Sequence, residues 1–206
     1  MKKLTALLLG EHRLWLLLGA VVVSTAVGLG VLGSLPFFFK HHRIVSDGMA
    51  PTLTKGDIAV VRRRPYGAIG DVRRGDVVSW IKYARGSSYT MVWRVVGLPG
   101  DELRFVDTTV TLNGEPVEHA PLPSAEGLLF TERLDGRLYP VAYDREAERT
   151  PVDVLVRPGH LFLVGDNRDH AFDSRGSGSV PFSAIVGRLV WPSPTVRSAG
   201  GVAHDP

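Results

Sequence analysis

The segment Gly165–Arg175 contains the densest set of side chains that can do chemistry. It holds three Asp, two Arg, one Asn and one His within eleven residues. Carboxylates and imidazoles are common general acids and bases, and His170, with Asp169 and Ser174 close by, suggests a Ser/His/Asp arrangement. Residues so near in sequence rarely converge on one substrate atom, and Asp and Asn are also frequent in turns. The composition alone therefore fits either a catalytic loop or an ordinary turn.

Two earlier stretches favour the catalytic interpretation. Residues 46–53 have the sequence S-D-G-M-A-P-T-L, and residues 94–101 have the sequence R-V-V-G-L-P-G-D. In this order, and with the loop, they resemble bacterial type I signal peptidase, a family of membrane-anchored serine proteases that use a Ser/Lys dyad. The resemblance covers residues 44–190, with a poorly matching middle. Further matching motifs are Arg74–Val78, Gly178–Pro181 and Ile185–Arg188.

The resemblance places the family's nucleophile and base on residues that cannot fill these roles. Gly48 stands where the family has its nucleophilic Ser, and it has no side chain to attack with. Trp93 stands where the family has its basic Lys, and an indole N–H only donates. Ala171 replaces a Ser that supports the lysine amine. Because a Ser/Lys protease needs an attacking oxygen and a neutral lysine base, the resemblance implies a member without its own dyad.

The residues around these three positions match the family. Ser46 corresponds to the serine that helps to form the oxyanion hole. Arg94 and Asp166 correspond to an ion pair that joins two motifs, and we interpret this pair as scaffold. The remaining matches are the peptide-binding positions Met49 and Pro51 and a second structural pair, Asp173 and Arg175.

An alternative is that other residues restore catalysis. Ser46 would be the nucleophile, with Lys82 or His170 as its base. In an extended segment Ser46 and Gly48 face the same side about 6.6 Å apart, at ~3.3 Å per residue. Catalysis tolerates misplacement of only about 1 Å, so an unchanged substrate pose would not bring the bond to Ser46.

An uncharged stretch precedes these motifs. Residues 14–39 contain no charged side chain, and the 22 residues of Leu14–Leu35 would span about 33 Å as a helix at ~1.5 Å per residue. This predicts a transmembrane helix over 14–39 after a short N-terminal segment, 1–13. Pro36 ends the predicted helix. The apolar run is long for a signal peptide and lacks a cleavage site of small residues, which argues against a cleaved signal peptide. A slight excess of Lys and Arg before the stretch favours a cytoplasmic N-terminus, with the main domain outside the cell membrane.

The chain after the anchor has the pattern of short strands separated by turn residues. Apolar runs lie between Gly, Pro, Asn and Asp throughout residues 40–192, and Asn113-Gly114 predicts a type I′ hairpin. We therefore expect an all-β, antiparallel, open-barrel-like domain, which the family resemblance also implies. Residues 115–153 are rich in Pro and charge and predict a variable surface excursion, and 193–206 predict a loose tail.

Composition excludes several other classes. The absence of Cys excludes disulfides and thiolate chemistry. No H-E-x-x-H or similar spacing predicts a metal site, and no phosphate-binding loop is present, so we expect no cofactor. A formal charge of +3 is too small to indicate nucleic-acid binding.

Three hypotheses follow. The preferred one is a catalytically inactive signal peptidase homologue that binds signal peptides of exported preproteins, or the secretion and processing machinery, at the lipid membrane. The second is an active serine endopeptidase with the unorthodox residues described above. The third is a membrane-anchored structural module without a peptide ligand.

Overall fold

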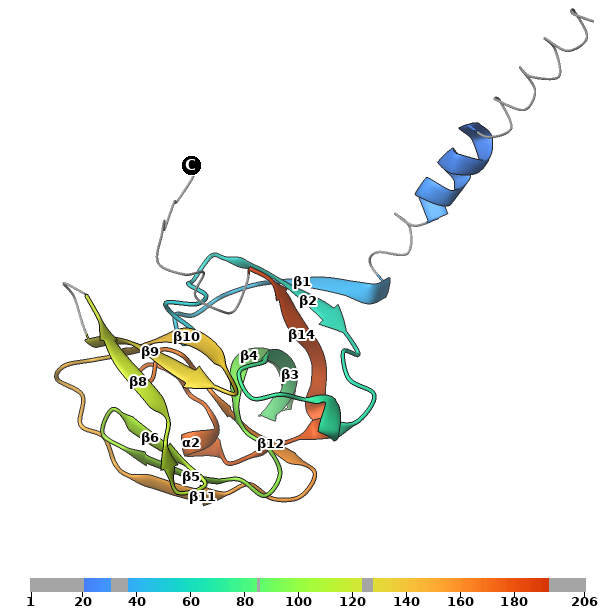
Figure 1. Cartoon of the computed structure of the whole chain (residues 1–206). Helices are drawn as coiled ribbons and strands as arrows, with labels where there is room; N and C mark the ends of the chain where they lie inside the picture. Colours follow the sequence, from blue (N-terminus) through green and yellow to red (C-terminus); the bar gives the residue numbers. More distant parts are fainter. Residues whose placement is uncertain (1–20, 31–36, 85, 124–127, 193–206) are drawn as a thin grey trace, which may run out of the picture. The chain divides into compact units, whose positions relative to one another are not determined.

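The computed structural model describes residues 21–30, 37–84, 86–123 and 128–192 (Figure 1). The chain forms two compact units, Met1–Phe39 and Lys40–Pro206. In the first unit, residues 21–30 are helical. Within the described residues no helix is both long enough and apolar enough to cross a bilayer. The predicted span 14–39 lies partly outside the described residues, and the predicted segment 1–13 and the predicted tail 193–206 lie wholly outside them.

The second unit is built from antiparallel sheets, as the sequence predicts. In the described part of the chain, the largest sheet has seven strands in the order β1-β2-β14-β3-β4-β12-β13. These strands are β1 (Phe39–Arg43), β2 (Ile58–Arg63), β14 (Ile185–Trp191), β3 (Val77–Ala84), β4 (Ser87–Gly97), β12 (His160–Val164) and β13 (Val180–Pro181). Short helical turns connect them: η1 (Ile69–Asp71), α2 (Ser174–Ser177) and η2 (Phe182–Ala184).

Two smaller sheets lie to one side of the large one in Figure 1. One has the order β11-β5-β6-β7 and the other β10-β9-β8. Their strands are β11 (Val152–Leu155), β5 (Glu102–Val106), β6 (Thr109–Leu112), β7 (Glu115–Pro116), β10 (Arg137–Tyr143), β9 (Leu128–Leu134) and β8 (Glu118–Leu122). Asn113 and Gly114 join β6 to β7 with φ of 53° and 85°, which confirms the predicted type I′ turn.

The prediction of a surface excursion over 115–153 is wrong for β9 and β10. Tyr139 and Val141 are fully buried, and Glu132 is 1% exposed. Pro121 and Pro140 lie within strands. Proline lacks the N–H group that a strand donates to its neighbour, so these residues favoured the prediction of a loop. The apolar positions of this sheet complete a core with Phe162 and other residues of the neighbouring sheets.

The burial pattern of the strands shows how they face the core. In β5 every second side chain is buried, which is the pattern of a strand with one face toward a core. The large sheet covers one apolar cluster that includes Leu53, Trp93 and Leu163. The smaller sheets share the other cluster with Val96 and Phe162. Because β4 and β12 contribute to both clusters, they connect the two halves of the domain.

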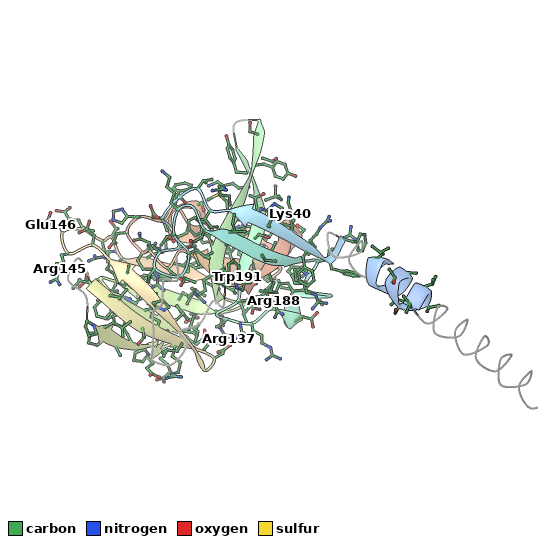
Figure 2. The ribbon with its side chains drawn as sticks, turned by 90° about the horizontal axis from the view of Figure 1, so that it is seen from above. Lys40, Arg137, Arg145, Glu146, Arg188 and Trp191 are labelled. Carbon is green, nitrogen blue, oxygen red and sulfur yellow. The ribbon has the colours of Figure 1, made fainter. Side chains whose placement is uncertain are left out.

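Charged residues also connect the sheets. Arg137 of β10 and Arg188 of β14 lie near one another in Figure 2, and both reach Oδ1 of the buried Asp76, at 2.5 and 3.9 Å. The hydroxyl of Tyr66 donates to the other oxygen of Asp76 at 2.8 Å. Asp76 therefore holds parts of two sheets and the loop before η1 together.

Candidate functional site

Gly48 and Trp93 are in direct contact. A Cβ placed on Gly48 would lie 2.6 Å from Cη2 and 2.8 Å from Cζ3 of the indole. Real Cβ atoms do not approach other heavy atoms so closely, so the indole occupies the space that any side chain at position 48 would need. Trp93 is only 4% exposed and packs within the apolar cluster of the large sheet. Positions 48 and 93, which correspond to the nucleophile and the base in the resembled family, are thus adjacent. The Trp93 side chain fills the space that a side chain at position 48 would occupy.

The loop after β12 closes the other side of this contact. A Cβ on Gly165 would overlap Cβ of Ala171 and the carbonyl oxygen of Gly48, and it would lie 3.0 Å from Cζ3 of Trp93. The backbone N–H of Asn167 donates to the Gly48 carbonyl at 3.1 Å. The absence of side chains at 48 and 165 therefore leaves room for the six-membered ring of Trp93, and Ala171 lies beside both glycines.

The segment before Gly48 is not extended, contrary to the geometry assumed for Ser46. Residues 46 and 47 form a bend and residues 48–52 a turn. Ser46 is exposed, whereas Met49 is 2% exposed and anchors the turn in the core. Pro51 is exposed on the turn. The backbone N–H groups of Ala50 and Leu53 close it by donating to Asp47 and Met49, each at 2.9 Å.

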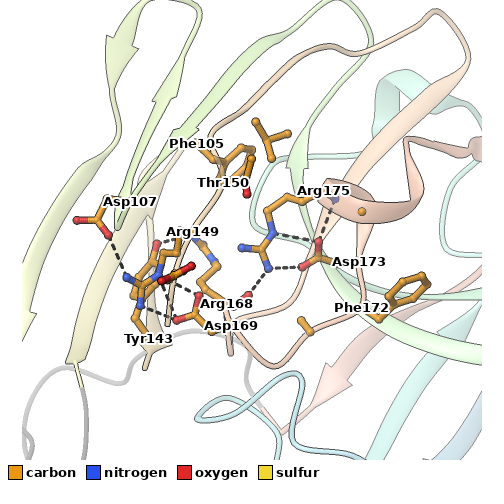
Figure 3. Close-up of a pocket in the computed structure, with 14 residues that line it drawn as sticks. Phe105, Asp107, Tyr143, Arg149, Thr150, Arg168, Asp169, Phe172, Asp173 and Arg175 are labelled. Atoms are coloured by element: carbon orange, nitrogen blue, oxygen red, sulfur yellow. Dashed lines mark hydrogen bonds and ion pairs between the residues drawn. The ribbon is translucent and has the colours of Figure 1, made fainter. Parts of the chain in front are cut away.

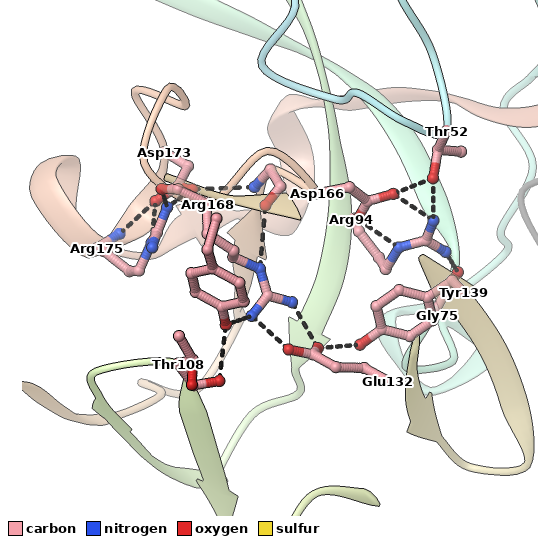
Figure 4. A network of polar contacts seen from close by, with 12 residues as sticks. Thr52, Gly75, Arg94, Thr108, Glu132, Tyr139, Asp166, Arg168, Asp173 and Arg175 are labelled. Carbon is pink, nitrogen blue, oxygen red and sulfur yellow. Dashed lines mark hydrogen bonds and ion pairs between the residues drawn. The ribbon is translucent and has the colours of Figure 1, made fainter. Parts of the chain in front are cut away.

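Arg94 and Asp166 form the ion pair that the sequence predicts (Figure 4). Nε and Nη2 of Arg94 donate to the two carboxylate oxygens at 2.8 and 2.6 Å, and both residues are at most 1% exposed. Nη1 donates to the carbonyl of Gly75 at 2.9 Å, and the hydroxyl of Thr52 donates to Asp166. The guanidinium lies 3.9 Å from the ring centroid of Tyr139. The pair therefore joins β4, the turn after Gly48 and the loop after β12.

Asp173 and Arg175 also form the predicted pair. Nε and Nη2 of Arg175 donate to the Asp173 carboxylate at 3.0 and 2.8 Å. The same carboxylate caps α2 by accepting from the backbone N–H of Arg175, and it accepts from the backbone N–H of Gly165 at 2.9 Å. Asp173 thus fixes both ends of the loop that covers Trp93.

A third buried pair, Arg168 with Glu132, was missed by the sequence analysis. Nη1 and Nη2 of Arg168 donate to the two oxygens of Glu132 at 2.6 and 2.5 Å, and both side chains are at most 2% exposed. The hydroxyl of Tyr139 donates to Glu132 at 3.0 Å (Figure 4). Glu132 lies in the stretch that matches no family motif. The sequence therefore contains no indication of this pair other than the presence of Arg168 in the loop.

A polar cavity of about 220 Å³ lies behind the loop (Figure 3). Arg149 crosses it, donating to Asp169 at 2.7 Å and to Asp107 at 2.9 Å. Burial alone raises the pKa of Asp169, but hydrogen bonds from Arg149 and from the backbone N–H of Asp144 outweigh it and leave the pKa below its usual value. Each arginine of this cavity has a carboxylate partner, so its charges are balanced within the protein.

The motif that ends at Asp101 is held in the same way. Nη2 and Nε of Arg74 donate to Asp101 at 2.6 and 2.8 Å. Burial raises the pKa of Asp101. Hydrogen bonds from Arg74, the backbone N–H of Leu98 and Asn113 lower it by more, so the pKa is below its usual value. This pair connects the turn before β3 with the turn after β4.

The alternative catalytic residues are not assembled into a site. The ammonium of Lys82 lies 4.0 Å from the ring centroid of the exposed Phe172. His170 is exposed, and its nearest carboxylate is Asp144, with Nε2 and Oδ2 3.8 Å apart. Ser174 is buried and accepts from the backbone N–H of Leu163. In the described part of the chain, no hydrogen bond links Ser46 to either proposed base.

A groove runs beside Trp93 along β4. It has a volume of about 190 Å³ and is lined by His42–Ser46 and Met49 on one wall and by Thr90–Trp93 on the other. β4 pairs with β3 from Ser87 to Arg94, but its other edge pairs with β12 only from Arg94 onward. Among the described strands, none pairs with that edge between residues 87 and 93. The groove therefore has an open strand edge as one wall.

No metal centre is formed by the described residues. The structure brings together no group of three or more His, Asp or Glu side chains that could hold an ion there.

The chain is similar to known proteins over most of its length. Residues 15–193 match the family model described as signal peptidase, peptidase S26. It is 32% identical to signal peptidase I of Bacillus caldolyticus over 159 residues, covering 76% of this chain and 81% of the relative. It is 33% identical to signal peptidase I of Pseudomonas fluorescens, covering 77% of this chain and 67% of the relative. The crystal structure of a signal peptidase I from Enterococcus faecalis matches 58% of this chain and 97% of its own, with 21% identity and a TM-score of 0.37.

Proposed function

The chain belongs to the signal peptidase family, peptidase S26, and we propose that it is a member that binds signal peptides without cleaving them. The observation that carries this proposal is the contact between Gly48 and the Trp93 indole. A peptidase of this kind needs an oxygen nucleophile beside a base that accepts its proton. Gly48 supplies no oxygen, and the indole N–H supplies no acceptor.

Loss of the dyad has not left a disordered loop at this place. The ion pairs of Arg94, Arg168 and Arg175 hold the walls of the site, and buried pairs of this kind are costly to break singly. The indole ring also packs against Gly48 and lies close to Gly165. These contacts support a stable, filled site rather than a catalytic site awaiting a missing group.

Peptide binding is supported by the groove beside β4. An extended peptide that lies along an open strand edge gains main-chain hydrogen bonds, and this mode of binding needs no nucleophile. The groove's open edge at residues 87–93 offers such bonds next to the turn that contains Ser46 and Gly48. Signal peptides of exported preproteins are the ligand class we assign to it.

We further propose that residues 14–39 anchor the chain in the cell membrane as a single span, with the β domain outside. The proposal rests on the absence of charged residues from this stretch. At that location the domain would meet membrane lipid, and its partners would include secretion or processing machinery.

The test is cleavage of a fluorogenic signal-peptide substrate by the full-length chain in detergent. We expect no turnover by the natural chain. Trp93→Lys alone stays inactive because it restores no nucleophile, and Gly48→Ser alone stays inactive because the new Cβ would collide with the indole. The double variant Gly48→Ser with Trp93→Lys removes that collision and restores both groups, so it is the one from which we expect turnover.

The competing hypothesis of an active enzyme makes the opposite prediction. It requires turnover by the natural chain that Ser46→Ala abolishes. That pair of results would overturn the proposal, whereas cleavage unaffected by Ser46→Ala would exclude Ser46 as the nucleophile.

A further inference from the structure

Two residues that line the groove beside β4 each have a buried side-chain nitrogen without a hydrogen-bond partner. Of the residues that the structure describes, five have a buried side-chain nitrogen or oxygen with no hydrogen bond. Two of the five, His42 through Nε2 and Trp93 through Nε1, belong to residues that line this one groove, on opposite walls. The other three are Ser79, Trp80 and His119.

An unpaired buried polar group is costly, and native proteins satisfy more than about 90% of them. The cost falls when a ligand supplies the missing partner. Trp93 can only donate, so it needs an acceptor. His42 offers one donor and one acceptor nitrogen when it is neutral. Burial, together with the charges of Lys40 and His41, lowers the pKa of His42, which favours its neutral form.

We propose that Trp93 and His42 are the residues by which the groove recognises the main chain of a bound peptide. The Nε1–H of Trp93 donates to a peptide carbonyl, and Nε2 of His42 pairs with a peptide amide group from the other wall. This deepens the proposed function and rests on it. The substitution that removes the family's base would then supply a binding group in the same position.

The dimensions and polarity of the groove favour an extended main chain as the occupant. A volume of about 190 Å³ is small beside the ~300–1,000 Å³ of typical pockets for small molecules. Its apolar lining residues, among them Ile44, Met49 and Val92, suit uncharged side chains. A peptide presents a carbonyl and an N–H at each residue, which are the partners that an indole and a neutral imidazole require.

The test observes the indole directly. The full-length chain is labelled with ¹⁵N-tryptophan in detergent, and the Trp93 resonance is assigned by its loss in Trp93→Phe. An uncharged signal-peptide segment is then added. We expect the Trp93 indole N–H resonance to move downfield as the peptide binds, while the Trp80 resonance stays in place. Trp80 is the matched control because its Nε1 is also buried and unpartnered but lines a different cavity.

Affinity measurements extend the test to variants. Loss of one net hydrogen bond corresponds to a roughly 2- to 13-fold weaker Kd. We expect this loss for Trp93→Phe and for His42→Leu, and no change for the matched variants Trp80→Phe and His119→Leu. Urea unfolding of Trp93→Phe monitors stability, so weaker binding by a folded variant is distinguished from unfolding.

The outcomes separate the two proposals. If no peptide binds the natural chain, the proposed function fails. If peptide binds with the Trp93 resonance unmoved and with equal affinity in Trp93→Phe and His42→Leu, only this inference fails. A Trp93 resonance that moves on dilution of the protein, without peptide, would show a second copy as the occupant and would also overturn it.

Discussion

At the scale of single residues, the contact between Gly48 and Trp93 determines what the site can be. Positions 48 and 93 are not independent of one another, because the indole ring leaves no room for a side chain at position 48, and Ala171 lies beside Gly48. A large residue in place of a lysine would otherwise be overpacked in this core. The proposed loss of the nucleophile and of the base would therefore be one change in packing.

This packing predicts the cost of Gly48→Ala. The added Cβ would collide with Cη2 and Cζ3 of Trp93, so we expect a loss of about 1–3 kcal/mol in the free energy of unfolding. The control is Gly70→Ala, because a Cβ at the exposed Gly70 meets nothing within 4 Å. In a Trp93→Leu background the cost of Gly48→Ala should shrink. An equal cost in both backgrounds, measured by urea unfolding, would show that the indole is not the obstacle.

At the scale of elements, the loop after β12 is positioned by strands that are distant in sequence. Arg94 of β4 pairs with Asp166, and Glu132 of β9 pairs with Arg168. The loop is also attached through its backbone, since the N–H of Ala142 donates to the Asp166 carbonyl and the N–H of Arg168 donates to the Ala142 carbonyl. The β8–β10 sheet is therefore part of the site's support.

Two neighbouring glutamates allow this support to be tested. Glu132→Ala leaves Arg168 charged and buried, and we expect it to cost about 3–5 kcal/mol in the free energy of unfolding. Glu118→Ala removes a partner of Arg133 in an exposed pair on the adjacent strand, and about 0–1 kcal/mol is expected. Chemical denaturation of both variants measures the difference. Similar losses would mean that the buried pair does not hold the loop.

At the scale of the whole molecule, ion pairs between separate elements make the fold sensitive to acid. The pKa values of Asp101 and Asp169 are lowered in the folded protein. Such carboxylates stabilise the fold at pH values above their unfolded pKa of about 4, and this contribution is lost as the pH falls through the folded pKa.

We therefore expect the free energy of unfolding to fall as the pH drops below about 4. In the double variant Asp101→Asn with Asp169→Asn, stability should be lower at neutral pH and should depend less on pH in this range. Urea unfolding at a series of pH values measures both effects. An unchanged slope in the double variant would assign the acid sensitivity to other groups.

Much of this architecture could be predicted from the sequence. Apolar runs bounded by turn residues predicted strands along residues 40–192, and β2–β6, β12 and β14 are such runs. The resemblance to the signal peptidase motifs implied the pairs Arg94–Asp166 and Asp173–Arg175, and both pairs form.

The remainder depends on contacts that local sequence does not reveal. Prolines within β8 and β10 obscured a sheet whose stability comes from burial of Tyr139 and Val141. Glu132 carries no motif, and its role follows only from Arg168 facing it across the fold. The contact of Trp93 with Gly48 likewise could not be predicted from local sequence, because 44 residues separate the two in the chain.

The central claim is that the site binds a signal peptide and leaves it intact. The most direct measurement is to saturate the full-length protein in detergent with a signal-peptide segment that spans a cleavage site, incubate for a day, and determine the mass of the bound peptide. We predict that the peptide co-purifies with the natural chain at its full mass. Recovery of two fragments from the natural chain, but not from Ser46→Ala, would contradict the account.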